Sequence, residues 1–390
     1  MKIGIIEICE PNHYTAVEAL AITYAQNNLN QITVFTLSDL KISFPFPQEN
    51  IKTELNKQNE TVLAYLKRIA ALDFDVIHIN TISSYYKEFS CIDWQSKTVL
   101  TIHNIETFFD NPLKKQVELL KFRLKKASLA KLKTTVYLPI KYFIKEKKRQ
   151  RYRDIVVEKA KAKGDKILVY GNTQKEYLQR YLKAANIIVF PFCIHQTPQD
   201  LSLNNKELRV CIPGSVDDHR RDYDGLLEGL KENATFFKGK IMIDLLGYIP
   251  KNNQYLIPKI KELQNLGLLF RYQKDFIQTN EFENRLNSCD IILGNLKPSL
   301  DNQSKYGQTK ETGVIFNMIK AAKPGIFPNS YPIPNDLKTI CLSYQDNALI
   351  VLKQLIENPS LLVSLKEKAK LAVKVYEPKN LYPKLIQDLK

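Results

Sequence analysis

The sequence lacks several features that would place its 390 residues in a special structural class. No stretch approaches the run of about 18 apolar residues that a membrane-spanning helix needs. None of the six cysteines forms a CxxC pair, which argues against a metal site and against a disulfide framework. The N-terminal segment MKIGIIEI has too short an apolar core for a signal peptide and instead predicts a first strand. These absences favour a globular protein of the cytoplasm.

Positive charge, by contrast, is concentrated in one segment. The net charge is +16, and residues 114–154 hold fifteen Lys and Arg against three acids. Apolar side chains such as Leu120 and Phe122 alternate with these cations, a pattern typical of helices that bind anionic bilayers. We therefore expect residues 114–154 to contact an anionic membrane surface, with the protein peripheral at its inner face. A solvated run of charge is the alternative. No common nucleic-acid-binding module accompanies the charge, so no nucleic-acid partner is expected.

Apolar runs of strand length alternate with segments of helical period along the whole chain. In the first half, strands are expected at 2–8, 31–37, 75–80, 98–104, 166–172 and 186–192, with helices at 16–27 and 60–72. In the second half, strands are expected at 208–214, 240–247, 268–273, 289–295, 324–328 and 338–343, with helices at 223–233, 254–267 and from 313. Buried strands separated by helices predict a parallel, doubly wound sheet in each half.

The polar segment 193–207 interrupts this alternation and is the expected linker. The sequence therefore predicts an α/β fold with two Rossmann-like domains, at 1–195 and 206–370. The basic insertion belongs to the first domain, and residues 371–390 are expected to form a C-terminal helix that returns to it. Ligands of such sheets bind at the carboxyl ends of the strands, so we expect the two domains to face a central cleft.

Two turns of the second domain suit an anion. Gly214 and Ser215 follow a strand and precede the basic pair Arg220 and Arg221. Their backbone N–H groups and guanidinium groups are the donors that phosphate favours. A plain connection between strand and helix remains the alternative.

The second turn lies in YGQTKETGVIFNMIKAAKPGIFP, residues 306–328. Thr312 is the expected N-cap of a helix that begins at Gly313, and its first N–H groups would bind an anion. Glu311 precedes this helix and would repel phosphate, so we expect it to accept hydrogen bonds from sugar hydroxyls. Stabilisation of the helix dipole is its alternative role.

In the first domain, His103 and Asn104 end the strand at 98–104, and His13 and Glu18 follow the first strand. A strand-end histidine with a purely structural role is the alternative for His103. No glycine-rich phosphate fingerprint follows the first strand, so dinucleotide binding is not favoured.

Taken together, PGSVDDHRRDY, the His103–Asn104 pair and KETGVIFNMIKAAKPGI resemble the retaining GT-B glycosyltransferases of group 1, the family-4-like enzymes, over the whole chain. The resemblance implies a nucleotide-sugar donor whose diphosphate is held by the two turns of the second domain. These donor-binding residues are Gly214, Ser215, Arg220, Arg221, Thr312 and Gly313. Counting back from Lys323–Pro324 places the ribose-binding position at Asn317, where the family has glutamate. Glu311 stands for the family's first glutamate, one residue closer than usual.

The resemblance also implies an activity. We expect a hexosyltransferase that moves a sugar to a lipid-linked or glycan acceptor in cell-surface polysaccharide or glycolipid synthesis, with retention and with no metal or other cofactor. Its expected catalytic residues are His103, Glu311 and Arg220, and His13 and Asn104 lie on the acceptor side. An inverting enzyme would instead need a base, for which Glu7, Glu10 and His13 are candidates. A sugar-nucleotide epimerase of the same fold and a non-catalytic basic binding protein remain alternatives.

Overall fold

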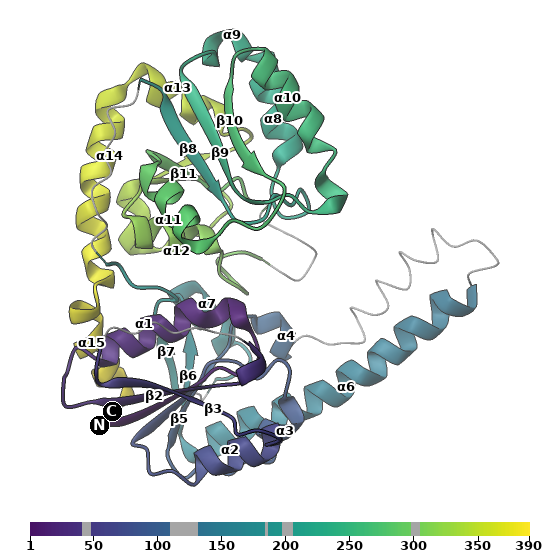
Figure 1. Cartoon of the computed structure of the whole chain (residues 1–390), viewed down its shortest axis with the longest axis vertical. Helices are drawn as coiled ribbons and strands as arrows, with labels where there is room; N and C mark the ends of the chain where they lie inside the picture. The colour runs from purple at the N-terminus through teal and green to yellow at the C-terminus, as the bar shows by residue number, and fades with distance from the viewer. Residues whose placement is uncertain (41–47, 110–131, 184–185, 197–205, 298–304) are drawn as a thin grey trace. The chain divides into compact units, whose positions relative to one another are not determined.

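The computed structural model describes residues 1–40, 48–109, 132–183, 186–196, 206–297 and 305–390. These residues form two compact units (Figure 1). Unit 1 contains Met1–Phe190 and Ile386–Lys390, and unit 2 contains Pro191–Leu385. The division thus lies slightly before the expected end of the first domain at residue 195. The second unit also continues past residue 370.

The sheet of unit 1 is parallel throughout and has the strand order β3-β2-β1-β4-β5-β6-β7. Its strands are β1 (Lys2–Ile6), β2 (Gln31–Thr36), β3 (Ile51–Leu55), β4 (Val76–Ile79), β5 (Lys97–Thr101), β6 (Lys166–Val169) and β7 (Asn186–Val189). The six expected strands are confirmed. Strand β3 was not expected from the sequence, because this edge strand, IKTEL, is mostly exposed and carries no apolar run.

Helices cover both faces of this sheet (Figure 1). They are α1 (Tyr14–Tyr24), α2 (Val62–Ala70), α3 (Tyr86–Ser90), α4 (Ile105–Phe109), α6 (Leu132–Lys163) and α7 (Asn172–Gln179). Figure 1 shows α1 and α7 on one face and α2, α3 and α6 on the other. Apolar residues of β1, β4, β5 and α3 share one continuous core, and β1 and β4 are buried on both faces.

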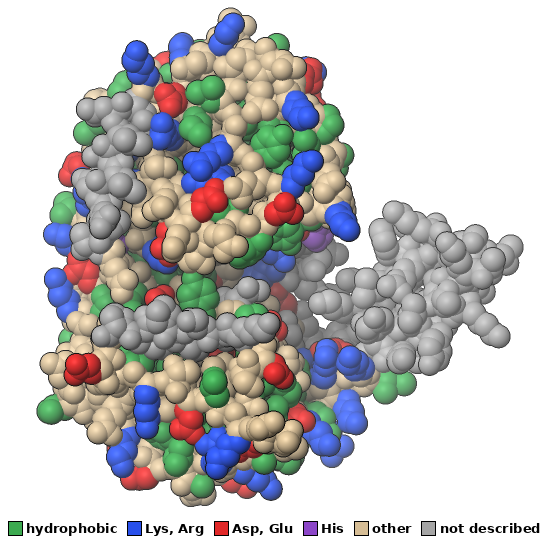
Figure 2. All heavy atoms as spheres, in the orientation of Figure 1, with side chains coloured by type: hydrophobic (Ala, Val, Ile, Leu, Met, Phe, Trp, Pro, Cys, Tyr) green, Lys and Arg blue, Asp and Glu red, His purple; other side chains and the backbone are tan. Residues whose placement is uncertain are grey.

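Helix α6 occupies the described part of the expected basic insertion, and residues 114–131 of that insertion lie outside the described residues. Its C-terminal part packs on α3, where the buried guanidinium of Arg153 lies over the ring of Tyr86 and donates to Glu146 at 2.7 Å. Basic side chains along the described part of α6 reach the surface in Figure 2. They are Lys145, Lys147, Lys148, Arg149 and Arg151. No helix in the described part of the chain is both long enough and apolar enough to cross a membrane.

The sheet of unit 2 is also parallel, with the order β10-β9-β8-β11-β12-β13. Its strands are β8 (Leu208–Pro213), β9 (Ile241–Tyr248), β10 (Leu269–Gln273), β11 (Ile291–Leu293), β12 (Gly325–Pro328) and β13 (Cys341–Tyr344). All six expected strands of this half are confirmed. The expected α/β class with two doubly wound sheets is therefore confirmed as well.

The helices of unit 2 flank its sheet. They are α8 (Tyr223–Glu232), α9 (Ala234–Phe237), α10 (Leu256–Asn265), α11 (Thr279–Ser288), α12 (Gly313–Ala321), α13 (Leu349–Glu357), α14 (Pro359–Ala372) and α15 (Pro378–Leu389). Helix α8 packs with α10 and α13, whereas α11 packs with α12 and belongs to a separate apolar cluster. Residues Ile386–Lys390, at the end of α15, are assigned to unit 1.

The strand orders show where each unit is expected to bind a ligand. In unit 1, β1 lies between β2 and β4, and in unit 2, β8 lies between β9 and β11. At these two positions the connections leave toward opposite sides, which opens a crevice at the carboxyl ends of the strands. The loops that follow β1 and β8 are therefore the first places to examine for a site.

Candidate functional site

Polar side chains from four neighbouring strands meet at the carboxyl edge of the unit 1 sheet. Glu7 follows β1, Asn80 follows β4, His103 follows β5 and Tyr170 follows β6. His13 joins them from the short 3-10 helix Pro11–His13 that leads into α1. We call these five residues the histidine cluster.

Glu7 is the anchor of the histidine cluster. Its side chain is fully buried, and Oε1 accepts hydrogen bonds from the backbone N–H groups of Cys9 at 2.9 Å and Glu10 at 3.0 Å. The Nδ2 group of Asn80 donates to its other oxygen at 2.6 Å. Three donors therefore hold this carboxylate in one orientation, as a buried charge requires.

Both ring nitrogens of His103 have partners inside unit 1. Nε2 lies 2.7 Å from the carbonyl oxygen of Asn80, and Nδ1 lies 2.8 Å from the hydroxyl of Tyr170. Burial, with a further contribution from His13, holds the pKa of His103 well below its usual range, so the ring is neutral. Because a carbonyl only accepts, the network assigns the proton to Nε2 and makes Nδ1 the acceptor of the Tyr170 hydroxyl.

The rings of His13 and His103 are stacked. Their centroids are 4.0 Å apart and their planes differ by 7°. Nδ1 of His13 lies 3.7 Å from a Glu7 oxygen, and the His13 side chain is 26% exposed. Two residues that are ninety positions apart in the sequence, both predicted to be site residues, therefore lie face to face in unit 1.

Two further candidates of unit 1 lie outside this network. Asn104 is exposed beside His103. Glu10 is partly buried, and its Oε1 accepts a hydrogen bond from the hydroxyl of Ser83 at 3.0 Å.

In unit 2, Gly214 and Arg221 determine the shape of the turn after β8. Gly214 has a φ of 97°, in the region that favours glycine, and a Cβ there would lie 2.9 Å from a guanidinium nitrogen of Arg221. That guanidinium is buried and donates to the carbonyl oxygens of Pro213 at 2.6 Å and Ser215 at 3.2 Å. The N–H of Gly214 donates to Leu246 O. Gly214 and Arg221 thus shape the turn, which differs from the direct contacts with an anion that the sequence suggested.

Arg220 points outward from the same turn. Its side chain is 53% exposed, and Nε lies 3.6 Å from a carboxylate oxygen of Asp217. Asp217 therefore orients this arginine. The guanidinium of Arg220 remains the accessible cation of the predicted pair.

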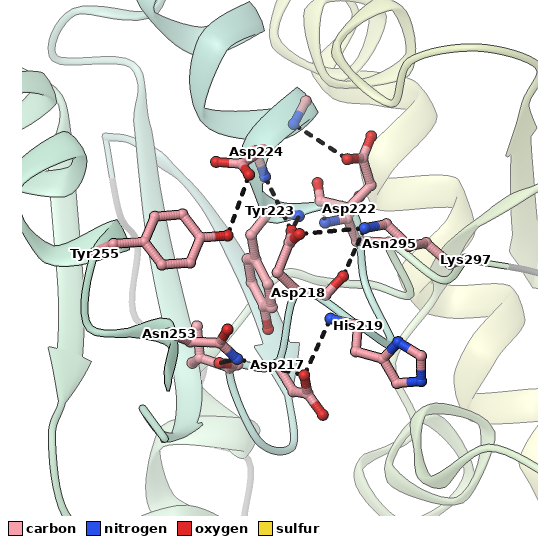
Figure 3. Close-up of polar contacts among 12 residues, drawn as sticks. Asp217, Asp218, His219, Asp222, Tyr223, Asp224, Asn253, Tyr255, Asn295 and Lys297 are labelled. Atoms are coloured by element: carbon pink, nitrogen blue, oxygen red, sulfur yellow. Dashed lines mark hydrogen bonds and ion pairs between the residues drawn. The ribbon is translucent and has the colours of Figure 1, made fainter. Parts of the chain in front are cut away.

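Asp218 has a different role from Asp217 (Figure 3). One of its oxygens accepts from the N–H of Tyr223 at 3.0 Å, and the other lies 3.2 Å from Nζ of Lys297. Figure 3 shows Asp218 between the start of α8 and Lys297, with the ring of His219 turned away. Lys297 also donates to the carbonyl oxygen of Asp218, so the loop after β11 is tied to the loop after β8.

Helix α12 begins as the sequence predicts. Thr312 is the N-cap, with Oγ1 accepting from the N–H of Val314 at 3.3 Å, and Gly313 is the first helical residue. The space where a Gly313 side chain would lie is open. Asn317 lies one turn later, where its Nδ2 donates to Gly313 O at 2.8 Å. The helix start therefore presents N–H groups beside an open space, which suits an anion.

Glu311 directly precedes the N-cap and is held by two hydrogen bonds. Its Oε1 accepts from the hydroxyl of Tyr331 and from the N–H of Thr312. Burial raises the pKa of this carboxyl to about 7, although both hydrogen bonds oppose the rise. The carboxyl thus exchanges its proton near neutral pH, where it can either donate or accept a hydrogen bond.

Sequence reasoning missed Asn80, Tyr170, Lys297 and Tyr331. Each follows a strand directly or within a few residues, so a search of strand ends for polar side chains would have found them. Their partners, however, come from other strands, and only the strand order reveals those. Within the described ranges, no group of three or more His, Cys, Asp and Glu side chains is arranged to hold a metal ion.

Comparisons with known proteins bear on the fold. No protein-family model and no curated protein matches the sequence. Among solved structures, the pneumococcal O-GlcNAc transferase GtfA in complex with UDP and GlcNAc is similar over 100% of this chain and 98% of its own, with a TM-score of 0.57 and 9% identity. A glycosyltransferase from Rickettsia africae is similar over 99% of this chain and 97% of its own, with a TM-score of 0.57 and 14% identity.

The N-terminal domain of trehalose-6-phosphate phosphatase from Candida albicans is also similar, over 100% of this chain and 96% of that one. Its TM-score is 0.56 and its sequence identity is 11%. Likeness at such identities concerns the course of the backbone, and activity has to be argued from the site residues themselves. The two parallel sheets and these structural similarities together show that the chain has the GT-B fold of two Rossmann-like domains.

Proposed function

We propose that this protein is a glycosyltransferase of the hexosyltransferase type, which moves a sugar from a nucleoside-diphosphate sugar to an acceptor hydroxyl. The observation that carries the proposal is the start of α12, where an N-capped helix presents its first N–H groups beside the open space at Gly313. The positive end of a helix dipole at a strand's carboxyl edge is a favourable place for a diphosphate.

The donor would be bound by unit 2. The N–H groups at Gly313, the turn at Ser215 and the exposed guanidinium of Arg220 would contact the diphosphate, and Asn317 would contact the ribose. Glu311 would contact the transferred sugar. The similar pneumococcal enzyme was solved with UDP and GlcNAc, so UDP-sugars are the first donors to test.

Retention is the stereochemical course that we propose. In that course the acceptor hydroxyl attacks on the face of the leaving group, and the departing diphosphate takes the proton. Arg220 and the dipole of α12 would stabilise the charge on the departing group without a metal ion. Both nitrogens of His103 are engaged by Asn80 and Tyr170. Its contribution to catalysis would therefore come through the ring of His13, which stacks on it.

The acceptor that we propose is lipid-linked or a glycan, in cell-surface polysaccharide or glycolipid synthesis. The exposed cations of α6 support a position at the inner face of an anionic membrane. Each Lys or Arg near such a surface contributes about 1 kcal/mol to binding. An enzyme held there would meet acceptors that carry a lipid anchor.

A thermal-shift screen against nucleotides and nucleotide sugars tests the proposal. A donor at 100 times its dissociation constant should stabilise the protein by about 2.7 kcal/mol. Gly313→Asp is the matched control. The space beside Gly313 is open to the aspartate side chain, and its carboxylate would repel the diphosphate. Lack of stabilisation by any nucleotide sugar, or equal stabilisation of Gly313→Asp, would refute the proposed donor site.

Product analysis then distinguishes the activities. Formation of an altered sugar nucleotide without an acceptor would identify an epimerase, whereas a glycoside formed only with an acceptor supports transfer. NMR analysis of the anomer tests retention, since a β-linked product from an α-linked donor shows inversion. Loss of activity in EDTA would show that a metal is needed.

A further inference from the structure

We infer that a cavity in unit 1 binds the hydrocarbon chain of an anionic membrane lipid. The cavity lies between α6 and strands β4 and β5, and the loop between α3 and β5 forms a further wall. The inference deepens the membrane association proposed above, and it rests on that association for the source of the chain.

The size and the walls of the cavity suit hydrocarbon. Its volume is about 380 Å³, and it is lined by the buried side chains of Phe89, Ile92, Leu100, Val156 and Ala160. Close-packed protein interiors contain few voids larger than a water molecule, whereas ligand sites occupy roughly 300–1,000 Å³. Since an apolar cavity of about 150 Å³ already binds benzene, this one can hold a longer apolar segment.

The cations in the wall of the cavity are held by the protein itself. Nζ of Lys159 donates to two backbone carbonyl oxygens, at 3.0 and 3.2 Å, and to the carboxylate of Asp93 at 2.6 Å. Nζ of Lys163 donates to the carbonyl oxygens of residues 94–96. An ammonium group has three N–H donors, so these contacts use the donors of both lysines.

The buried carboxylate of Asp165 in the wall is satisfied as well. It accepts hydrogen bonds from the backbone N–H of Thr98 at 3.0 Å and from the hydroxyl of Thr98 at 2.6 Å, and Nζ of Lys163 lies 3.9 Å away. The charged side chains of the wall therefore have partners in unit 1. A charged ligand would have to break these contacts, whereas a hydrocarbon chain leaves them intact.

One face of α6 connects this cavity to the basic surface of the same helix. Lys148, Tyr152, Ile155 and Lys159 recur at the spacing that places side chains on one side of a helix. Lys148 is exposed, and Tyr152 and Ile155 are partly exposed. A headgroup attracted by Lys148 would therefore have apolar side chains beside its chain on the way to the cavity. An anionic lipid fits this combination of an exposed cation and an apolar path.

The fluorescence of Trp94 reports whether the cavity is occupied. Trp94 lines the cavity, is partly exposed and is the single tryptophan of the sequence. Bromine atoms on a hydrocarbon chain quench tryptophan fluorescence on contact. The probes are dibromostearate, as a free chain, and vesicles of phosphatidylserine with brominated chains. We expect both to quench Trp94 in the full-length protein, dibromostearate in a saturable manner, and their unbrominated counterparts to leave it unchanged.

Filling the cavity should remove this quenching. Ala160 and Ala162 of α6 both line the cavity, and Ala162 is exposed, so Ala162→Leu serves if Ala160→Leu fails to fold. Each leucine should weaken the binding of dibromostearate about 15- to 60-fold, which corresponds to about two or three displaced methylene groups. Ala71→Leu, at an exposed position that ends α2, is the matched control and should bind like the wild-type protein. All three variants keep the cations of α6 and should still float with anionic vesicles.

Equal quenching of the wild-type protein and of both cavity variants would overturn the inference, because the bromine would then lie outside the cavity. Flotation of the wild-type protein with unquenched Trp94 would show that no lipid chain enters. Quenching by dibromostearate but not by the vesicles would assign the cavity to a free fatty acid instead. Absence of flotation would refute the proposed membrane association itself, and with it the lipid as the source of the chain.

Discussion

Tyr331 donates a hydrogen bond from its phenol to Oε1 of Glu311, and this contact ties the loop after β12 to the residue that precedes the N-cap of α12. The Tyr331 ring is itself fixed by stacking on Phe327 of β12, with centroids 4.9 Å apart. Glu311 therefore has a defined position although it lies in a loop.

Glu311 should make the stability of the protein depend on pH. Burial raises its pKa from 4.5 to about 7 in the folded state. Between these values the folded protein holds a proton that the unfolded chain has lost, so the contribution of Glu311 to stability falls as pH rises through this window. Glu311→Gln should remove the fall, which we expect to be on the order of 1–3 kcal/mol.

Urea unfolding at pH 5 and pH 8 measures this difference. The control is Glu367→Gln, which changes an exposed carboxylate that pairs with Lys370 on the surface of α14. Its stability relative to the wild-type protein should be the same at both values of pH. If Glu311→Gln behaves like this control, the pKa of the Glu311 carboxyl is not raised in the folded protein.

Glu311 and Asn317 should affect different kinetic constants. Glu311→Ala should lower kcat, because contacts to the transferred sugar are lost in the transition state. Asn317→Ala should mainly raise the donor KM, because a contact to the ribose strengthens ground state and transition state alike. Each lost hydrogen bond corresponds to about 1–3 kcal/mol. Wild-type kinetics in both folded variants would mean that the donor site lies elsewhere.

The basic surface of α6 should bind anionic bilayers. Replacing Lys147, Lys148 and Arg151 together by Glu should abolish flotation with vesicles that contain phosphatidylserine, because these exposed cations then repel the surface. The matched control makes the same replacement by Glu at three exposed lysines of unit 2, Lys261, Lys274 and Lys368. This variant should still float with the vesicles. Absence of binding by the wild-type protein at low salt would disprove the membrane proposal.

The buried pair of Arg285 and Asp244 should be important for the stability of unit 2. Arg285 on α11 is 2% exposed and forms an ion pair with Asp244 of β9. Removing one partner leaves a buried charge, so Arg285→Ala should cost about 3–5 kcal/mol of the free energy of unfolding. Arg209→Ala breaks a more exposed pair with Glu207 and should cost less than about 1 kcal/mol. Chemical denaturation compares the two, and equal losses would contradict this account.

The fold could be predicted because most of its strands are recognisable from a short run of neighbouring residues. Runs such as IGII in β1 and VCIP in β8 are apolar and buried at every position, which happens where a strand is covered on both faces. The edge strand β3 could not be recognised in this way, since four of its five residues are at least partly exposed. The start of α12 was also predictable, because an N-cap threonine followed by an apolar helix is a signal within a few residues.

The roles of individual site residues were harder to predict from the sequence. The sequence suggests that Arg220 and Arg221 act alike, yet Arg221 is buried under Gly214 while Arg220 points outward. Adjacent residues in a turn point in different directions, and nothing in their spacing shows which one is covered. Likewise, the sequence places Glu311 beside the expected phosphate site, but its proton affinity depends on burial and on Tyr331.

Neighbouring residues are enough to specify the alternation of strands and helices, the concentration of charge in 114–154 and the helix that begins at Gly313. The stacking of His13 on His103, and the contacts of Glu7, Asn80 and Tyr170 around this pair, arise only in the folded protein. These residues come from loops far apart in the chain. They meet because parallel strands place their carboxyl ends at one edge, in an order that only the folded sheet defines.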